Sequence, residues 1–314
     1  MLDYSTERIL KGAKLRTMAP ANQFKLNDDE YLTLINDELQ TNLVPMILSV
    51  REDFFLQDVT YNLTYDSGAG FGLTYFGLSP FGDPISITTS DLLQRAIGTV
   101  IKDIWIVDNN LKFQWGVVPI SFQDIKGNPN VVGYYFKGTE IVFHRPENFN
   151  NKIARIHWFR KPNELVFSDL CTTVLYQNTT DSTITLNSLP AGWGIGTKID
   201  LLTKTQAFDS IVDSVTITDL PGGNVIEVSQ VPESLDEGDY VVPEGYACVA
   251  QIPLNAVPVL EQLGAIKILE SMRDEKGLAN ALVQLERLKS NFLSVISNRS
   301  KSNVKSLGGY GLWK

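Results

Sequence analysis

Histidine most often serves as an acid, a base or a metal ligand near neutral pH, yet it occurs only twice in the 314 residues. His144 and His157 each lie in a segment that predicts a β-strand, and no His/Cys/carboxylate cluster has the spacing of a metal site. The chain has no G-x-S-x-G nucleophile motif and no G-x-x-x-x-G-K-[ST] phosphate loop. We therefore predict a protein that is not an enzyme and that uses neither a cofactor nor a metal.

Carboxylates and thiols are the other side chains that could do chemistry. With 36 acidic residues, the composition does not exclude a pair of carboxylates that hydrolyses a glycoside. Residues 28–30 (DDE), however, fit the first turn of a helix, where the helix dipole favours negative charge. Asp236, Glu237 and Asp239 are predicted to be solvated in a turn ahead of a strand. Cys171 and Cys248 are predicted to be buried free thiols, with a disulfide as the alternative.

Two glycine-rich segments, residues 68–72 (GAGFG) and 192–196 (GWGIG), could approach a cofactor phosphate. Neither begins a helix after a buried strand, which is the context of a pyrophosphate site, so we predict loops at both. The first belongs to an insertion, residues 67–87, that also carries large apolar side chains such as Phe71, Tyr75, Phe76 and Phe81. The insertion either packs on its own domain or docks on a partner, because exposed apolar surface is a liability on a monomer.

Helices are predicted at the N-terminal end. Ser5 can cap a short basic helix, and Asn27 with Glu30 forms a capping-box pattern. The following helix has one apolar stripe over about seven turns, and Pro45 should kink it. Its stripe consists of Leu32, Ile35, Leu39, Leu43, Ile47, Val50 and Phe54.

From residue 58 to residue 252 the pattern is that of β-strands joined by tight turns, which predicts antiparallel hairpins. A first group of strands is expected at 59–65, 99–107, 111–117, 132–136, 141–144 and 154–159. A second group, which could form a small barrel or sandwich, is expected at 173–176, 183–186, 198–202, 214–218, 225–228 and 240–242.

The helical pattern returns at Leu254, and a turn at residues 273–277 predicts a hairpin of two helices. The last helix should bury Leu278, Leu282, Leu285, Leu288, Phe292 and Ile296. This hairpin needs an apolar partner, and the N-terminal stripe can supply one. We therefore predict an α+β fold, with a helical bundle built from residues 1–57 and 253–297 around a large inserted antiparallel β region, residues 58–252, divisible into 58–169 and 170–252.

Charge is distributed unevenly. The net charge of −9 argues against general affinity for nucleic acid, and no signal peptide or membrane span is recognisable, so folding in a cytosol is expected. Residues 298–314 are predicted to form a flexible basic tail. The tail could touch nucleic acid, but we favour ordering on a neighbouring subunit through Arg299, Lys301, Lys305, Tyr310 and Trp313.

Two segments at opposite ends of the chain resemble the neck or adaptor proteins of tailed bacteriophages, which are related to tail tubular protein A and to ring proteins of crAss-like phages. The first runs through residues 26–30 (LNDDE), 43–45 (LVP) and 47–55 (ILSVREDFF). The second comprises residues 251–253 (QIP), 258–260 (PVL), Asp274 and 277–279 (GLA). Residues 104–108 (IWIVD) and 158–162 (WFRKP) resemble the middle strands of that family, although the insertion departs from its simpler members.

The resemblance implies a virion protein without catalytic activity. Its subunits would form a twelve-fold ring under the portal, join the head to downstream tail or ring proteins, and line a channel through which genomic DNA passes without specific binding. The tail residues and the aromatic residues of the insertion would then lie at subunit interfaces. Two alternatives remain open from the sequence: a β-rich module that binds a glycan or a protein, which would need exposed aromatic residues such as Trp193, and an enzyme acting on cell-wall polysaccharide.

Overall fold

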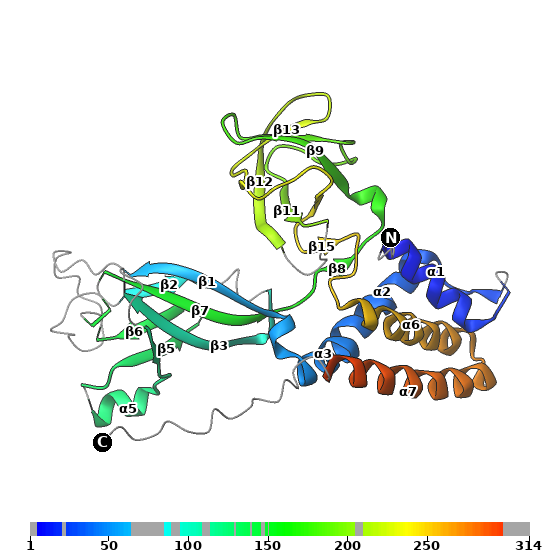
Figure 1. Ribbon diagram of the computed structural model, residues 1–314, viewed down its shortest axis with the longest axis horizontal. Coiled ribbons are helices and arrows are strands. Elements are labelled where there is room, and N and C mark those ends of the chain that lie inside the picture. Colours follow the sequence, from blue (N-terminus) through cyan, green and yellow to red (C-terminus); the bar gives the residue numbers. More distant parts are fainter. Residues whose placement is uncertain are drawn as a thin grey trace, which may run out of the picture. The chain divides into compact units, whose positions relative to one another are not determined.

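A computed structural model describes residues 5–20, 23–63, 85–88, 95–108, 114–128, 130–138, 140–145, 148–149, 151–204 and 210–297. It confirms the α+β prediction, with helices at both ends of the chain and antiparallel sheets in the middle (Figure 1). The chain forms two compact units, Met1–Arg51 with Pro162–Lys314, and Glu52–Lys161. The second β group therefore shares a unit with the helices, because segments flanking it hydrogen-bond to the first helix: the backbone N–H of Thr6 donates to the Cys248 carbonyl at 3.0 Å.

Helix α1 (Thr6–Thr17) begins as predicted, with the Ser5 side chain accepting a hydrogen bond from the backbone N–H of Arg8. Helix α2 (Asp28–Glu38) begins with the predicted capping box, in which Asn27 Oδ1 accepts from the Glu30 N–H and a Glu30 carboxylate oxygen accepts from the Asn27 N–H, both at 2.8 Å. These local polar signals fix both helix starts because each satisfies backbone donors that the first helical turn leaves unpaired.

The predicted long helix is confirmed from Asp28 to Val50, with a local disturbance before Pro45, but it ends before Phe54. A π-helical turn, η2 (Leu39–Leu43), precedes α3 (Val44–Val50), and a separate 3₁₀ turn, η3 (Glu52–Phe54), carries Phe54. Pro45 lacks an N–H, and in a regular helix its ring would meet the carbonyl four residues earlier. The π turn relieves that clash, with the Val44 N–H bonding to the Leu39 carbonyl.

Helix α6 (Val257–Met272) is the centre of the bundle. It follows the 3₁₀ turn η6 (Leu254–Ala256), and all eight residues from 259 to 266 are buried, so every side of the helix is covered. Helices α1, α2 and α7 (Glu275–Ser297) each pack against it (Figure 1). The predicted hairpin turn is confirmed: Arg273 adopts a left-handed conformation, and Asp274 Oδ1 accepts from the Gly277 N–H at 2.9 Å.

Two glycines let the helices approach closely. A Cβ on Gly12 would lie 2.2 Å from Glu261 Oε1, and a Cβ on Gly264 would lie 2.8 Å from Ile35 Cγ1. No side chain fits at either position without displacing a neighbour. The Glu261 side chain therefore packs on the backbone of α1 at Gly12, and Ala13 of α1 and Ile35 of α2 pack on the backbone of α6 at Gly264.

The second unit, Glu52–Lys161, contains two antiparallel sheets that share one core. One sheet has the order β1-β7-β3-β4, and the other has the order β2-β6-β5. Side chains from both sheets, including Leu63, Ile104 and Phe143, form the core. The strands are β1 (Leu56–Leu63), β2 (Ile85–Thr88), β3 (Ala96–Asp108), β4 (Gln114–Val117), β5 (Gly133–Lys137), β6 (Glu140–His144) and β7 (Lys152–Arg160), with a short helix α5 (Phe122–Gly127) after β4.

In the first unit, the second β group forms a closed barrel with the order β10-β13-β12-β11-β14-β9. Alternating apolar residues such as Ile184, Leu201 and Ile217 fill it. Its strands are β9 (Thr172–Asn178), β10 (Thr183–Leu186), β11 (Lys198–Leu202), β12 (Ser210–Gly222), β13 (Val225–Val228) and β14 (Tyr240–Pro243). Beside it, β8 (Glu164–Leu165) and β15 (Tyr246–Ala247) pair in parallel, and η5 (Ser168–Leu170) leads into β9.

Candidate functional site

The outer face of α1 is a stripe of basic and apolar side chains. The helix buries Ile9, Leu10 and Ala13, while Arg8, Lys11 and Leu15 are exposed on the opposite side. Met18, at the end of the helix, continues the stripe. Leu15 is 64% exposed and Met18 is 93% exposed. Because these four positions recur at steps of three and four residues, they lie in one line roughly 15 Å long.

An open pocket of about 570 Å³ borders this stripe. Its lining mixes apolar side chains with charges of both signs, which is typical of a protein contact surface rather than of an enclosed small-molecule site. The lining residues are Glu7, Leu10, Lys11, Lys14, Leu15, Met18, Ala19, Phe24, Asp28 and Phe167.

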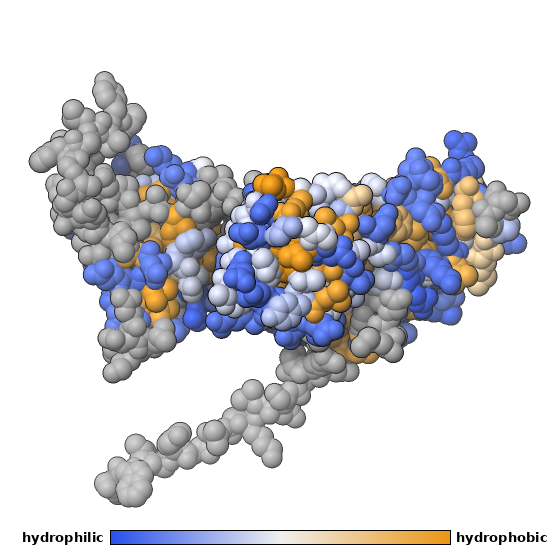
Figure 2. Space-filling view, turned by 90° about the horizontal axis from the view of Figure 1, so that it is seen from above, coloured by the Kyte–Doolittle hydropathy of each residue, from blue (hydrophilic) through white to orange (hydrophobic). Residues whose placement is uncertain are grey.

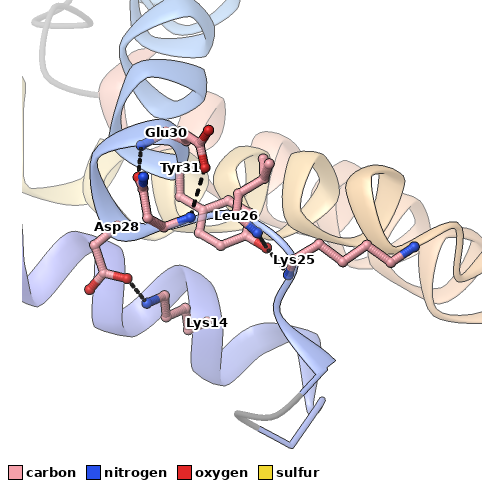
Figure 3. A network of polar contacts seen from close by, with 7 residues as sticks. Lys14, Lys25, Leu26, Asp28, Glu30 and Tyr31 are labelled. Carbon is pink, nitrogen blue, oxygen red and sulfur yellow. Dashed lines mark hydrogen bonds and ion pairs between the residues drawn. The ribbon is translucent and has the colours of Figure 1, made fainter.

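A polar network fixes the wall of this pocket where α1 meets the start of α2 (Figure 3). Lys14 forms an ion pair with Asp28, and its ammonium group lies 5.4 Å from the centre of the Phe24 ring. The buried hydroxyl of Tyr31 accepts hydrogen bonds from the backbone N–H groups of Lys25 at 3.2 Å and Leu26 at 3.3 Å. The loop before α2 is therefore held in place by buried contacts, and the pocket wall is preformed.

The outer face of α2 is acidic. Asp29, Thr33 and Asp37 follow each other at four-residue steps and are exposed, and Glu30 lies beside them. Tyr31, on the inner side, is buried with Leu32 and Ile35. The stripe therefore concentrates negative charge on the side of α2 that faces away from the bundle core.

Helix α7 also exposes apolar side chains, which corrects one part of the predicted stripe. Leu282 is exposed, and Ala281 is buried in its place; Leu285, Phe292 and Ile296 are buried as predicted. The exposed side also carries Val283 and Val295. A second open pocket, of about 620 Å³, is lined by Val283, Glu286, Arg287, Ser290 and Asn291.

The barrel also exposes apolar groups, visible as orange atoms among hydrophilic ones in Figure 2. Leu175, Tyr176 and Ile195 are exposed. On β9 the pairing register shifts so that Val174 and Tyr176 have partners on β10 and Leu175 is the extra residue of a bulge. Trp193, by contrast, is partly buried against the barrel core. The exposed aromatic residue on this part of the barrel is thus Tyr176.

A buried polar cluster joins the barrel to the strand that precedes it. The Asp200 carboxylate, which is fully buried, accepts hydrogen bonds from the backbone N–H groups of Ser214 and Gly245, both at 2.9 Å, and from Asn163 Nδ2 at 3.1 Å. The Asn163 backbone N–H in turn donates to Gln251 Oε1 at 2.7 Å. These bonds satisfy the buried carboxylate, so the cluster holds the start and the end of the barrel together.

The acidic turn before β14 differs from its prediction. Asp239 is buried rather than solvated, and its carboxylate accepts hydrogen bonds from the backbone N–H groups of Lys204 at 2.9 Å and Asp236 at 2.7 Å. It therefore closes the turn structurally. Asp28 and Glu30 have the predicted places in the first turn of α2.

The two thiols are buried and free, as predicted. A hydrogen bond from the Cys171 thiol to Cys248 raises the pKa of Cys171, and burial raises it further. The same hydrogen bond lowers the pKa of Cys248. Both residues flank the barrel, and the Cys248 carbonyl accepts from the Thr6 N–H at the start of α1.

The remaining candidates for chemistry have structural surroundings. His144 Nδ1 lies 3.1 Å from the Val131 carbonyl oxygen. His157 Nδ1, on β7, contacts the Asp103 carboxylate on the neighbouring strand β3. Residues 192–196 form turns between β10 and β11, as predicted for a loop. Among the described residues, no three His, Cys, Asp or Glu side chains are grouped so that they could hold a metal ion.

The predicted interface residues are not placed. Arg299, Lys301, Lys305, Tyr310 and Trp313 of the tail lie outside the described residues. The same holds for the aromatic residues of the insertion, Phe71, Tyr75, Phe76 and Phe81, and for the first glycine cluster. The α1 stripe was not predicted from the sequence, because a single apolar residue such as Leu15 on the basic side of a helix is no signal by itself.

No helix in the described part of the chain has the length and apolar character that a membrane crossing requires. Comparison of the sequence with protein-family models and with curated proteins found no match.

Proposed function

We propose that this chain is a structural virion protein whose copies form a ring connecting the portal of a phage head to the tail and lining the DNA exit channel. The observation that carries the proposal is the outer face of α1, where Leu15 and Met18 are exposed beside a preformed pocket on the helical bundle. Exposed apolar groups grouped in this way mark surfaces that contact other proteins. The sequence resemblance to phage neck proteins supplies the kind of assembly.

Several further surfaces support an assembly with more than one partner. Leu282 and Val283 on α7 and Tyr176 on the barrel are exposed, and they lie on different elements of the same unit. A connector needs separate contacts to its neighbours in the ring, to the portal and to downstream tail or ring proteins. The net charge of −9 suits a channel from which DNA must slide without sticking, because like charges lower non-specific affinity.

Negative-stain imaging and mass photometry of the purified chain, over a range of concentrations, test this proposal. We expect closed rings with a central hole, whose mass gives the number of subunits. The same measurements with portal-containing capsids should show added density at the portal vertex. A chain that stays monomeric at every concentration and does not bind those capsids would overturn the proposal.

A second candidate function is a binding module in which the barrel recognises a glycan or a protein. Tyr176, 65% exposed on β9 next to Leu175, favours it because exposed aromatic residues stack on sugars and anchor protein contacts. A glycan array with the intact chain tests this function. Saturable binding that Tyr176→Ala abolishes would support the module, and an array without signal would remove the glycan ligand.

A further inference from the structure

We infer that the outer face of α1 in one copy of the chain docks on the outer face of α2 in the next copy. This inference rests on the proposed ring and names the surfaces that would build it. It starts from the charges on the two faces: Arg8 and Lys11 are exposed on α1, and Asp29 and Asp37 are exposed on α2. None of these four side chains forms an ion pair with any described residue, so each is available to a partner.

Packing against α6 determines which side of α1 and of α2 is exposed. Helices α1 and α2 both pack against α6, and each turns its buried side toward it: Ile9 and Ala13 on α1, Leu32 and Ile35 on α2. The exposed side of each helix therefore points away from α6. A copy presents a basic and apolar face on α1 and an acidic face on α2.

Opposite charges on different faces select the symmetry of the contact. Two α1 faces would each carry Arg8 and Lys11, and two α2 faces would each carry Asp29 and Asp37, so both self-pairings bring surfaces of like charge together. The pairing of α1 with α2 of the next copy is attractive. Because it joins two different surfaces, it is head-to-tail, and a head-to-tail contact that closes generates a ring.

The two faces also match in size and chemistry. The α1 stripe from Arg8 to Met18 is roughly 15 Å long, and the α2 stripe from Asp29 to Asp37 is roughly 12 Å long, at 1.5 Å per residue. Leu15 and Met18 supply the apolar anchors that charges alone lack. The charged half of the contact should weaken as salt rises, whereas the apolar half should not.

A charge-reversal exchange tests the pairing. One variant, Arg8→Glu with Lys11→Glu, makes α1 acidic; the other, Asp29→Lys with Asp37→Lys, makes α2 basic. Each alone would place like charges at every contact and should weaken association at least about tenfold, as measured by sedimentation velocity. An equimolar mixture of the two variants restores an attractive contact at every interface, so rings should return with the variants alternating and an even number of subunits.

A chain carrying all four reversals should also form rings by itself and should not mix with the wild type. The matched control is Lys137→Glu with Lys276→Glu, which makes the same charge change at exposed positions away from the α1 and α2 faces and from both pockets, and it should leave rings intact. Far-UV circular dichroism of every variant establishes that the helices are folded.

The outcomes separate the two proposals. If each single-face variant still forms rings as the wild type does, or if the mixture of the two variants does not reassociate, the pairing of α1 with α2 is overturned. The proposal that the chain forms a ring is then unaffected. A wild-type chain that forms only a symmetric dimer would overturn the head-to-tail contact. A wild type that never associates, alone or with portal-containing capsids, would overturn the ring and the pairing together.

Discussion

Replacing Gly12 with Ala should destabilise the helical bundle, although alanine is the better helix former. A Cβ at this position would lie 2.2 Å from Glu261 Oε1, 2.4 Å from Cδ and 2.9 Å from Cγ. Glu261 cannot move without cost, because its other carboxylate oxygen accepts hydrogen bonds from Arg16 Nε at 3.0 Å and Nη2 at 2.8 Å. Only 8% of the Glu261 side chain is exposed, so solvent cannot replace those bonds.

The magnitude follows from two opposing effects. Alanine in place of glycine within a helix stabilises by about 1 kcal/mol. Breaking a buried ion pair costs about 3–5 kcal/mol when one charge is left unpaired. Because the carboxylate is displaced rather than removed, the lower figure applies, and the net loss in the free energy of unfolding should be roughly 2 kcal/mol.

A double-mutant cycle measured by urea denaturation, followed by circular dichroism at 222 nm, tests the reasoning. Glu261→Ala removes all three atoms that the new Cβ would meet, so in that background Gly12→Ala should be neutral or stabilise by up to about 1 kcal/mol. Gly264→Ala is the control, since its Cβ would meet Ile35 and Ala13, and it should destabilise in both backgrounds. An equal cost of Gly12→Ala with and without Glu261 would refute the argument.

Three further substitutions probe other contacts. Asp200→Ala removes a fully buried carboxylate with three hydrogen bonds and should lower the free energy of unfolding by about 2–5 kcal/mol in urea titrations; a loss under about 1 kcal/mol would contradict its role. Tyr31→Phe leaves two backbone N–H groups without their acceptor and should lower the free energy of unfolding by about 1 kcal/mol. An unchanged melting temperature would show that the hydroxyl is dispensable. Burial raises the pKa of Glu7, but hydrogen bonds to its carboxylate from Ser168, from its own backbone and from Ser5 together lower the pKa below its ordinary value. A lowered pKa in the folded state stabilises the fold at pH values above the ordinary value of about 4.3, and this stabilisation is lost as the pH falls through the folded pKa. Glu7→Gln should therefore destabilise the protein at neutral pH and match the wild type in strong acid. Thermal melts measured across a range of pH check this.

Local signals made most elements predictable. The capping box at Asn27 and Glu30 and the cap at Ser5 depend on residues within three positions of one another, so neither requires knowledge of the fold. The barrel strands β10, β11 and β13 have the bounds predicted from their β-branched and apolar residues between turn segments. The fold class followed from the order of these elements along the chain.

Features that depend on distant contacts were not predictable in this way. The parallel pairing of β8 with β15 joins residues about 80 positions apart, and each strand has only two residues, too few for a pattern. Asp239 looked like a solvated turn residue because nothing in the sequence indicates that Lys204 would donate its backbone N–H to it. Ala281 and Leu282 are neighbours on α7, and only the packing against α6 decides which is buried.

The α1 stripe shows why the candidate interaction surface belongs to this second class. A single exposed leucine such as Leu15 is ordinary on a protein surface and indicates nothing by itself. It gains meaning because α6 fixes which side of α1 faces outward, and that side also carries Arg8, Lys11 and Met18. The same packing depends on Gly12, so a shift of α1 away from α6 would move the stripe as well as lower stability. If the α1 face builds the ring, Gly12→Ala should therefore weaken ring formation in conditions where the bundle is still folded, and Glu261→Ala should restore it.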